Sequence, residues 1–122
     1  MEKRANILIV EDDRIQAEAL KIFLTKLDYN VAGITKSGEE AIELSKQIEP
    51  DIILMDITLE GELDGIETAI KIHESLDNNI IYLTSRMDNE TRIIANKTNH
   101  KGFLSKPVNI NNLSKTLANC LP

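Results

Sequence analysis

The residues in this sequence best suited to chemistry are acidic side chains that directly follow two apolar runs. Glu11, Asp12 and Asp13 stand in a row after the first run, and Asp56 follows the third. Carboxylates packed together repel one another, which raises at least one pKa unless a cation is present. A few oxygen ligands beside open solvent suit Mg²⁺ that keeps several waters, rather than Zn²⁺. If the two runs are neighbouring strands, these acids predict a magnesium site.

Two further polar residues follow later apolar runs. Thr84 comes directly after residues 80–83, and Lys106 follows residues 102–104. Beside Mg²⁺, a hydroxyl and an ammonium can hold the oxygens of a phosphoryl group. Either residue alone is ordinary at the end of a strand, but their joint placement with the acids favours a phosphate site. For Asp13 a second interpretation is equally good, since an acid at the start of a helix caps its partly positive N-terminus.

The elements that position these residues can be read from the chain, in which short apolar runs alternate five times with segments of helical period. The runs occupy residues 7–10, 31–34, 52–55, 80–83 and 102–104. Those at 7, 52 and 80 are apolar throughout, as in strands covered on both faces. The segments between them carry one apolar stripe, for example Leu20, Phe23, Leu24 and Leu27. Such alternation predicts an α/β fold with a parallel sheet, whose ligands bind beyond the carboxyl ends of the strands.

Helix start signals support this division of the chain. Ser37 and Glu40 have the spacing of a capping box, in which each side chain satisfies a backbone amide near the other. Asp88 and Asn109 are predicted N-caps of the last two helices. The helix behind Asp56 is expected to begin at about residue 64, too far away for Asp56 to cap it.

Composition limits the possible functions. A length of 122 residues predicts one domain over residues 1–122, and 14 basic against 20 acidic residues give a net charge of −6. The negative charge argues against direct binding of nucleic acid. The single cysteine, Cys120, excludes an internal disulfide and points to a reducing compartment. No apolar run is long enough to span a membrane, and the N-terminus leaves no room for a signal peptide. A cytoplasmic protein is expected.

The ordered set of motifs resembles the receiver domain of two-component response regulators over the whole chain. The resemblance is carried by residues 7–13 (ILIVEDD), Asp56 after a buried run, residues 83–85 (LTS) and residues 102–107 (GFLSKP). It implies a flavodoxin-like, doubly wound (βα)5 fold with a five-stranded parallel sheet of order 2-1-3-4-5.

The resemblance also implies a chemistry. Asp56 would be phosphorylated by a histidine kinase or a histidine phosphotransfer protein. Mg²⁺ would be held by Glu11, Asp12, Asp56 and the backbone carbonyl of Thr58, with Glu11 acting largely through water.

Four further expectations come from the same resemblance. Thr84 and Lys106 match the residues that contact the phosphoryl group. Thr84 and Phe103 match the pair that switches conformation, with the ring at position 103 turning inward. We expect the inward ring to be favoured even before phosphorylation, because phenylalanine has no hydroxyl to hold at the surface. The peptide bond between Lys106 and Pro107 is expected to be cis.

One loop departs from the family pattern. Many receivers have a proline four residues after the phosphorylated aspartate, where this chain has Glu60. Gly65 arrives nine residues after Asp56, one later than in the commonest pattern. The loop consequently places Glu60, Glu62 and Asp64 near the expected metal.

We interpret the chain as a switch that modifies itself rather than a conventional enzyme. One alternative is a small Mg²⁺-dependent phosphatase with an aspartyl-phosphate intermediate. That mechanism normally needs an acid two residues after the nucleophile, where this chain has Thr58. Another is a receiver-like binding module that is never phosphorylated, against which the complete set of acids, Thr84 and Lys106 argues. The sequence names no downstream partner. His100 is expected to be exposed, and His73 to lie at the edge of the core.

Overall fold

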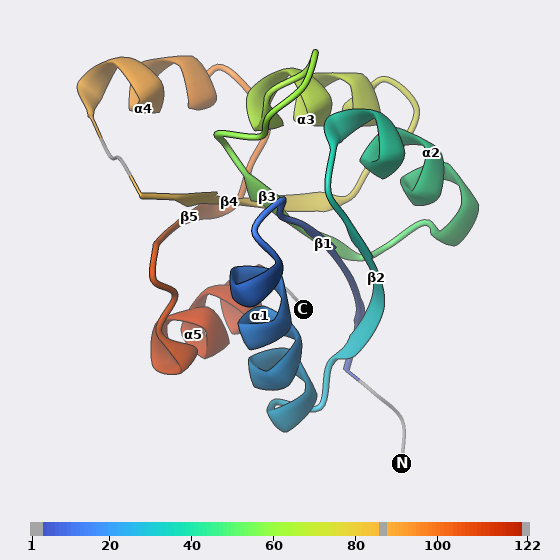
Figure 1. The fold of residues 1–122 in the computed structure, drawn as a ribbon, viewed down its shortest axis with the longest axis vertical. Coiled ribbons are helices and arrows are strands. Elements are labelled where there is room, and N and C mark those ends of the chain that lie inside the picture. The colour runs from blue at the N-terminus through green and yellow to red at the C-terminus, as the bar shows by residue number, and fades with distance from the viewer. Residues whose placement is uncertain (1–3, 86–87, 121–122) are drawn as a thin grey trace.

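Strands and helices alternate along the whole described chain. The structure is a computed structural model that describes residues 4–85 and 88–120. In chain order the elements are β1 (Asn6–Val10), α1 (Arg14–Lys26), β2 (Asn30–Thr35), α2 (Gly38–Ile48), β3 (Ile52–Asp56), α3 (Gly65–His73), β4 (Asn79–Thr84), α4 (Asn89–Ala95), β5 (Gly102–Ser105) and α5 (Ile110–Cys120). All five predicted strands and their intervening helices are present (Figure 1).

The strands form one parallel sheet in the order β2-β1-β3-β4-β5, which confirms the predicted topology. β1 pairs with β3 from Ile7↔Ile52 to Val10↔Met55. β3 pairs with β4 up to Asp56↔Leu83, and β4 pairs with β5 up to Thr84↔Ser105. The carboxyl ends of β1, β3, β4 and β5 therefore lie next to one another, at what we call the carboxyl edge of the sheet.

Helices cover both faces of this sheet, with α1 and α5 on one face and α2, α3 and α4 on the other (Figure 1). This arrangement explains the uninterrupted apolar run of β1. Ile7 and Ile9 pack in the core under α1 and α5, whereas Leu8 and Val10 pack under α2 and α3. All four side chains are fully buried, which is why the run from Ile7 to Val10 is apolar throughout instead of alternating with polar residues.

Side-chain caps begin the helices where the sequence predicts. Asp88 accepts from the amide of Thr91, and Asn109 accepts from the amides of Asn111 and Asn112. Ser37 accepts from the amide of Glu40, one half of the predicted capping box. The complete reciprocal box forms instead at the start of α3, between Asp64 and Glu67.

Of the two predictions about histidine burial, the one for His73 is confirmed and the one for His100 is not. His73 is half-buried at the end of α3, and its Nε2 lies 3.0 Å from the carbonyl oxygen of Asn78, as expected of the core edge. The prediction that His100 is exposed is wrong. Its ring is half-buried because it packs against Tyr82 and Phe103, with centroid distances of 5.3 and 4.7 Å.

No helix in the described part of the chain has the length and apolar character needed to cross a lipid bilayer.

Candidate functional site

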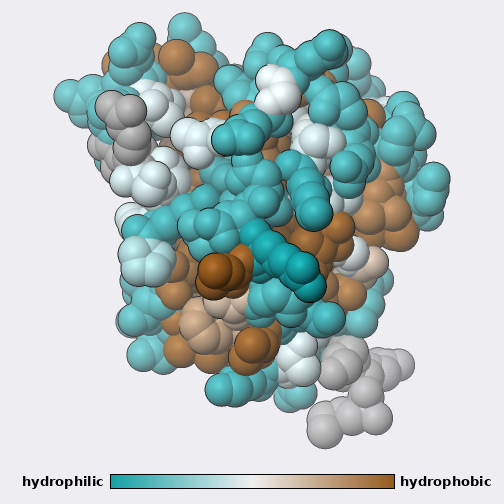
Figure 2. All heavy atoms as spheres, in the orientation of Figure 1, coloured by the Kyte–Doolittle hydropathy of each residue, from teal (hydrophilic) through white to brown (hydrophobic). Residues whose placement is uncertain are grey.

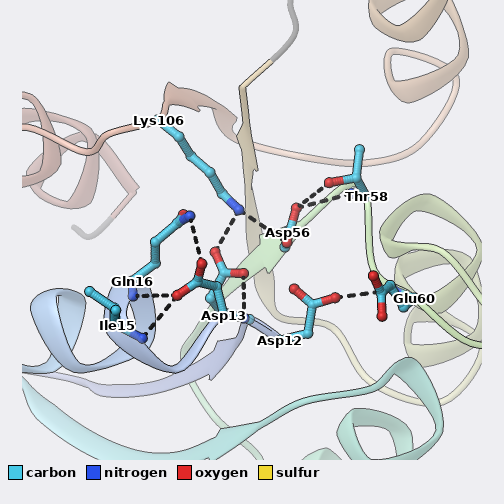
Figure 3. A network of polar contacts seen from close by, with 9 residues as sticks. Asp12, Asp13, Ile15, Gln16, Asp56, Thr58, Glu60 and Lys106 are labelled. Carbon is cyan, nitrogen blue, oxygen red and sulfur yellow. Dashed lines mark hydrogen bonds and ion pairs between the residues drawn. The ribbon is translucent and has the colours of Figure 1, made fainter.

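Three of the predicted acids meet at the carboxyl edge of the sheet. Glu11 directly follows β1, and Asp56 is the last residue of the neighbouring β3. Glu11, Asp12 and Asp56 each offer a carboxylate oxygen, and these oxygens lie within 4.8 Å of one another (Figure 3). Glu11 and Asp56 are only 1% and 2% exposed, while Asp12 is half-buried. The register of two strands thus brings together residues 45 positions apart in the sequence.

Lys106 supplies a positive charge to this cluster. Its Nζ lies 2.6 Å from Oε1 of Glu11 and 3.0 Å from Oδ2 of Asp56 (Figure 3). Burial disfavours the ammonium, but its hydrogen bonds to the two carboxylates outweigh that effect and raise the pKa of Lys106. The peptide bond between Lys106 and Pro107 is cis, as the resemblance implies.

One lysine does not neutralise three carboxylates. Burial, more than any other influence, raises the pKa of Glu11 from 4.5 to about 7. This net value also includes a rise due to the neighbouring Asp56 and a fall due to hydrogen bonds from Lys106 and the amide of Asp13. A divalent cation would relieve this repulsion between like charges. The donors are all oxygens beside a solvent-open pocket, and this donor set fits Mg²⁺.

Asp56 is held firmly in this pocket. The amide and hydroxyl of Thr58 both donate to Oδ1 of Asp56, at 3.0 and 3.1 Å. Gly65, at the start of α3, packs so closely that a Cβ there would lie 2.0 Å from the carbonyl oxygen of Asp56. The β3–α3 loop therefore fixes both the side chain and the main chain of Asp56.

Asp12 and Asp13 take different positions. Asp13 caps α1, because its Oδ1 accepts from the amides of Ile15 and Gln16 at 2.9 and 3.1 Å. The capping interpretation of Asp13 is therefore confirmed. Oδ2 of Asp12 instead accepts from the amide of Glu60 at 3.2 Å. The sequence indicated Glu60 only as an extra acid, since a backbone donor leaves no signature in the residue pattern.

The pocket collects most, but not all, of the predicted residues. It is lined by Glu11, Asp12, Asp13, Gln16, Asp56, Thr58, Glu60, Ser85, Lys106 and Pro107. Thr84 ends β4 beside the pocket but is 1% exposed and does not line it. Phe103 is the second residue of β5 and is half-buried against the rings of Tyr82 and His100. The two predicted switch residues thus stand behind the pocket rather than in it.

The surface beside the pocket is apolar. The hydrophilic surface over the strand ends borders an apolar area over α1 (Figure 2). Two isoleucines of this helix, Ile15 and Ile22, are 83% and 53% exposed. Large exposed apolar areas next to a polar site are typical of surfaces that other proteins cover.

Comparison with known proteins gives a consistent set of relatives. The model of the response regulator receiver domain matches residues 7–118. The chain is 38% identical over 102 residues to chemotaxis protein CheY of Thermotoga maritima, covering 83% of this chain and 84% of that protein. It is 34% identical over 112 residues to the transcriptional regulatory protein YdfI of Bacillus subtilis, covering 91% of this chain and 52% of that protein. The chain thus spans about half the length of the transcriptional regulators it matches.

Solved structures agree with this result. The signal receiver domain of a modulated diguanylate cyclase from Desulfovibrio desulfuricans G20 matches with a TM-score of 0.90 and 40% identity, over 96% of this chain and 93% of that one. The receiver domain of NarL from Mycobacterium tuberculosis matches with a TM-score of 0.89, and its 24% identity supports the fold alone.

Proposed function

The chain belongs to the response regulator receiver domain family of two-component systems, and on that premise we propose that Asp56 accepts a phosphoryl group from a phosphohistidine. A carboxylate oxygen of Asp56 attacks phosphorus, and the bond from phosphorus to the imidazole nitrogen breaks. The imidazole leaves with the bonding electrons and takes up a proton. The acyl phosphate on Asp56 is later hydrolysed by water, so the domain is a reversible switch rather than a conventional enzyme.

The observation that carries this proposal is the position of Lys106. Its ammonium lies 3.0 Å from Oδ2 of Asp56, so it can neutralise charge on the incoming phosphoryl oxygens without a large movement. Thr84, one strand away from Asp56, is the proposed hydroxyl partner of another phosphoryl oxygen. Positioning and charge stabilisation are the main contributions that a protein makes to phosphoryl transfer.

Mg²⁺ is the proposed cofactor. Glu11, Asp12, Asp56 and the backbone carbonyl of Thr58 are the residues that would hold it, and it would supply positive charge to the phosphoryl oxygens. The acidic cluster supports this assignment, since the two buried carboxylates of Glu11 and Asp56 share the single ammonium of Lys106.

We also propose that residues 1–122 are a single receiver domain and that the donor is a histidine kinase or a histidine phosphotransfer protein. The apolar surface of α1, which includes Ile15, borders the pocket and gives such a partner an area to cover.

Incubation with acetyl phosphate tests the site. Intact-mass spectrometry should find one added phosphoryl group in the presence of Mg²⁺ and none with EDTA. The Asp56→Asn variant should remain unmodified in both conditions. Modification of that variant to the same extent as the natural protein would overturn the assignment of Asp56.

A further inference from the structure

We propose that Glu60 is a positioning residue for the metal site and that it acts through its backbone amide. This inference rests on the proposed function, because it concerns the same acidic cluster. The amide of Glu60 donates to Oδ2 of Asp12 at 3.2 Å, across 48 positions of sequence. The bond ties the residue after Glu11 to the β3–α3 loop. Figure 3 shows the carboxylate of Asp12 between Glu60 and Asp56.

Among residues 4–85 and 88–120, the Glu60 amide is the one hydrogen-bond partner of the Asp12 carboxylate, so this bond restricts how the carboxylate can turn. Asp12 is half-buried at the mouth of the pocket, whereas Glu11 and Asp56 are buried and paired with Lys106. A hydrogen bond to an ionised carboxylate is stronger than one between neutral groups. With Oδ2 of Asp12 engaged by the amide, its other oxygen is left on the side of Asp56 (Figure 3). A cation then finds this ligand already oriented, as partners outside the ligand set commonly arrange.

The donor is itself held in place from both sides. Leu59, immediately before Glu60, is 6% exposed and packs in the core with α2 and α3. Gly61, immediately after it, has a φ of +109°, a conformation that side-chain-bearing residues rarely adopt. A buried anchor and a glycine turn therefore fix the direction of the Glu60 amide. Because the position of the amide is fixed independently of Asp12, the amide orients the Asp12 carboxylate and does not simply adapt to it.

The choice of residue at position 60 decides whether the bond can exist. Proline has no backbone N–H, so a proline here could not make the bond that Glu60 donates to Asp12. The side chain of Glu60 is exposed and also lines the pocket, so the amide and the carboxylate must be tested separately.

Three substitutions separate the two groups. Glu60→Ala and Glu60→Gln keep the amide and remove the charge, whereas Glu60→Pro removes both. Among the described residues, positive φ outside glycine occurs only at Asp28 and Glu49, so the sign of φ at position 60 suits proline. Titration calorimetry with MgCl₂ alone should show Mg²⁺ affinity within about threefold of the natural protein for the first two variants. For Glu60→Pro we expect an affinity about tenfold weaker than for Glu60→Ala, with the same melting temperature within a few degrees.

Equal affinities for Glu60→Pro and Glu60→Ala would overturn the inference. A second measurement needs no proline. Hydrogen exchange of the Glu60 amide, followed by NMR, should speed up about fivefold or more in Asp12→Ala, while the Gly65 amide, which bonds to the carbonyl of Ile57, should keep its rate. An unchanged Glu60 rate would also overturn it.

The role of Glu60 and the proposed function can be tested separately. If the natural protein binds Mg²⁺ and is phosphorylated on Asp56, but proline and alanine at position 60 behave alike, only the role of Glu60 is wrong. If the natural protein neither binds Mg²⁺ nor accepts phosphate from acetyl phosphate, the proposed function and the role of Glu60 are both wrong.

Discussion

The main-chain amide of Lys106 donates a 2.9 Å hydrogen bond to the carbonyl of Thr84. This bond extends the pairing of β4 with β5 beyond the last register pair, Thr84↔Ser105. The two residues proposed to contact the phosphoryl group are thereby fixed to each other through the backbone. We therefore expect a shift of one strand end to move the other, and β5 also carries Phe103.

Phosphorylation should therefore change the environment of Thr84 and Phe103, which lie behind the pocket, as well as the pocket itself. We expect beryllofluoride with Mg²⁺ to move the NMR signals of Thr84, Phe103 and the α4 and α5 faces, because under the proposed mechanism a phosphoryl group would draw the Thr84 hydroxyl toward it. The Asp56→Asn variant, which cannot form the adduct, provides the control and should show none of these shifts. If the signals of Thr84 and of both helix faces stay unchanged in the natural protein, this switch mechanism is wrong.

Close packing at Gly65 should support both the fold and the site. In Gly65→Ala the new Cβ would lie 2.0 Å from the carbonyl oxygen of Asp56 and 2.8 Å from Cα of Ile57, and both are backbone atoms. Relieving this overlap must displace the β3–α3 loop, so we expect a loss of about 1–3 kcal/mol in the free energy of unfolding and weaker Mg²⁺ binding. Urea unfolding and calorimetry measure the two effects.

Gly33→Ala is the matched control for that substitution. Its Cβ would meet mainly the tip of the Leu44 side chain, at 2.7 Å, and a flexible side chain can move aside. A smaller loss of stability and unchanged Mg²⁺ affinity are expected. If both alanine variants lower Mg²⁺ affinity equally, the contact of Gly65 with Asp56 has no special role.

The sequence predicts the strands and the acids that follow them, because both are marked by the residue types of the strand itself. The fully apolar run at residues 52–55 identifies β3, and a parallel sheet then places Asp56 at the edge where Glu11 also lies. The capping box of Asp64 and Glu67 was missed, although its spacing is the same as that of Ser37 and Glu40.

Other features depend on distant backbone and could not be read from residue types. The bond from Glu60 to Asp12 joins a backbone donor to a side chain 48 positions away, so no side-chain pattern marks it. The half-buried ring of His100 depends on how the segment after α4 folds back over Phe103. A polar residue just before a short strand carries no signal of such packing.

Because of this packing, His100 should make stability depend on pH. Nδ1 accepts from the amide of Gly102 at 3.0 Å, so Nε2 carries the proton and donates to Oδ1 of Asn96 at 2.8 Å. Burial lowers the pKa of His100 below its ordinary value of 6.5. The unfolded chain then binds a proton more readily than the folded one, and stability falls as pH drops through 6.5.

The His100→Phe variant keeps a ring against Phe103 and removes the titrating group together with its hydrogen bonds to Gly102 and Asn96. Those lost bonds lower stability at both pH values, so the comparison is of how stability changes with pH. We expect its loss of unfolding free energy between about pH 7.5 and pH 5 to be smaller than that of the natural protein. The unfolding of both proteins in urea at the two pH values provides the comparison. Equal losses would contradict a half-buried neutral imidazole at this position.

Glu11 should produce the opposite pH dependence. Burial raises the pKa of Glu11 from 4.5 to about 7. Between these two pH values the folded protein keeps a proton on Glu11 that the unfolded chain has lost. The stability contributed by this protonation is present below pH 4.5 and is lost as pH rises through about 7. A pKa difference of this size corresponds to a loss of about 3 kcal/mol in the free energy of unfolding.

The Glu11→Gln variant cannot lose this proton, and Gln is nearly the same size as Glu. With EDTA present, we expect the variant to become more stable than the natural protein at about pH 8, and the difference to shrink toward about pH 5. Mg²⁺ should reduce the difference at pH 8, because a bound cation stabilises the ionised carboxylates of the natural protein and is held more weakly by the variant. Urea unfolding at each pH, with EDTA or Mg²⁺, measures all four combinations. The same pH dependence in both proteins would show that Glu11 is ionised without penalty, and the cluster would then have no need of a cation at this carboxylate.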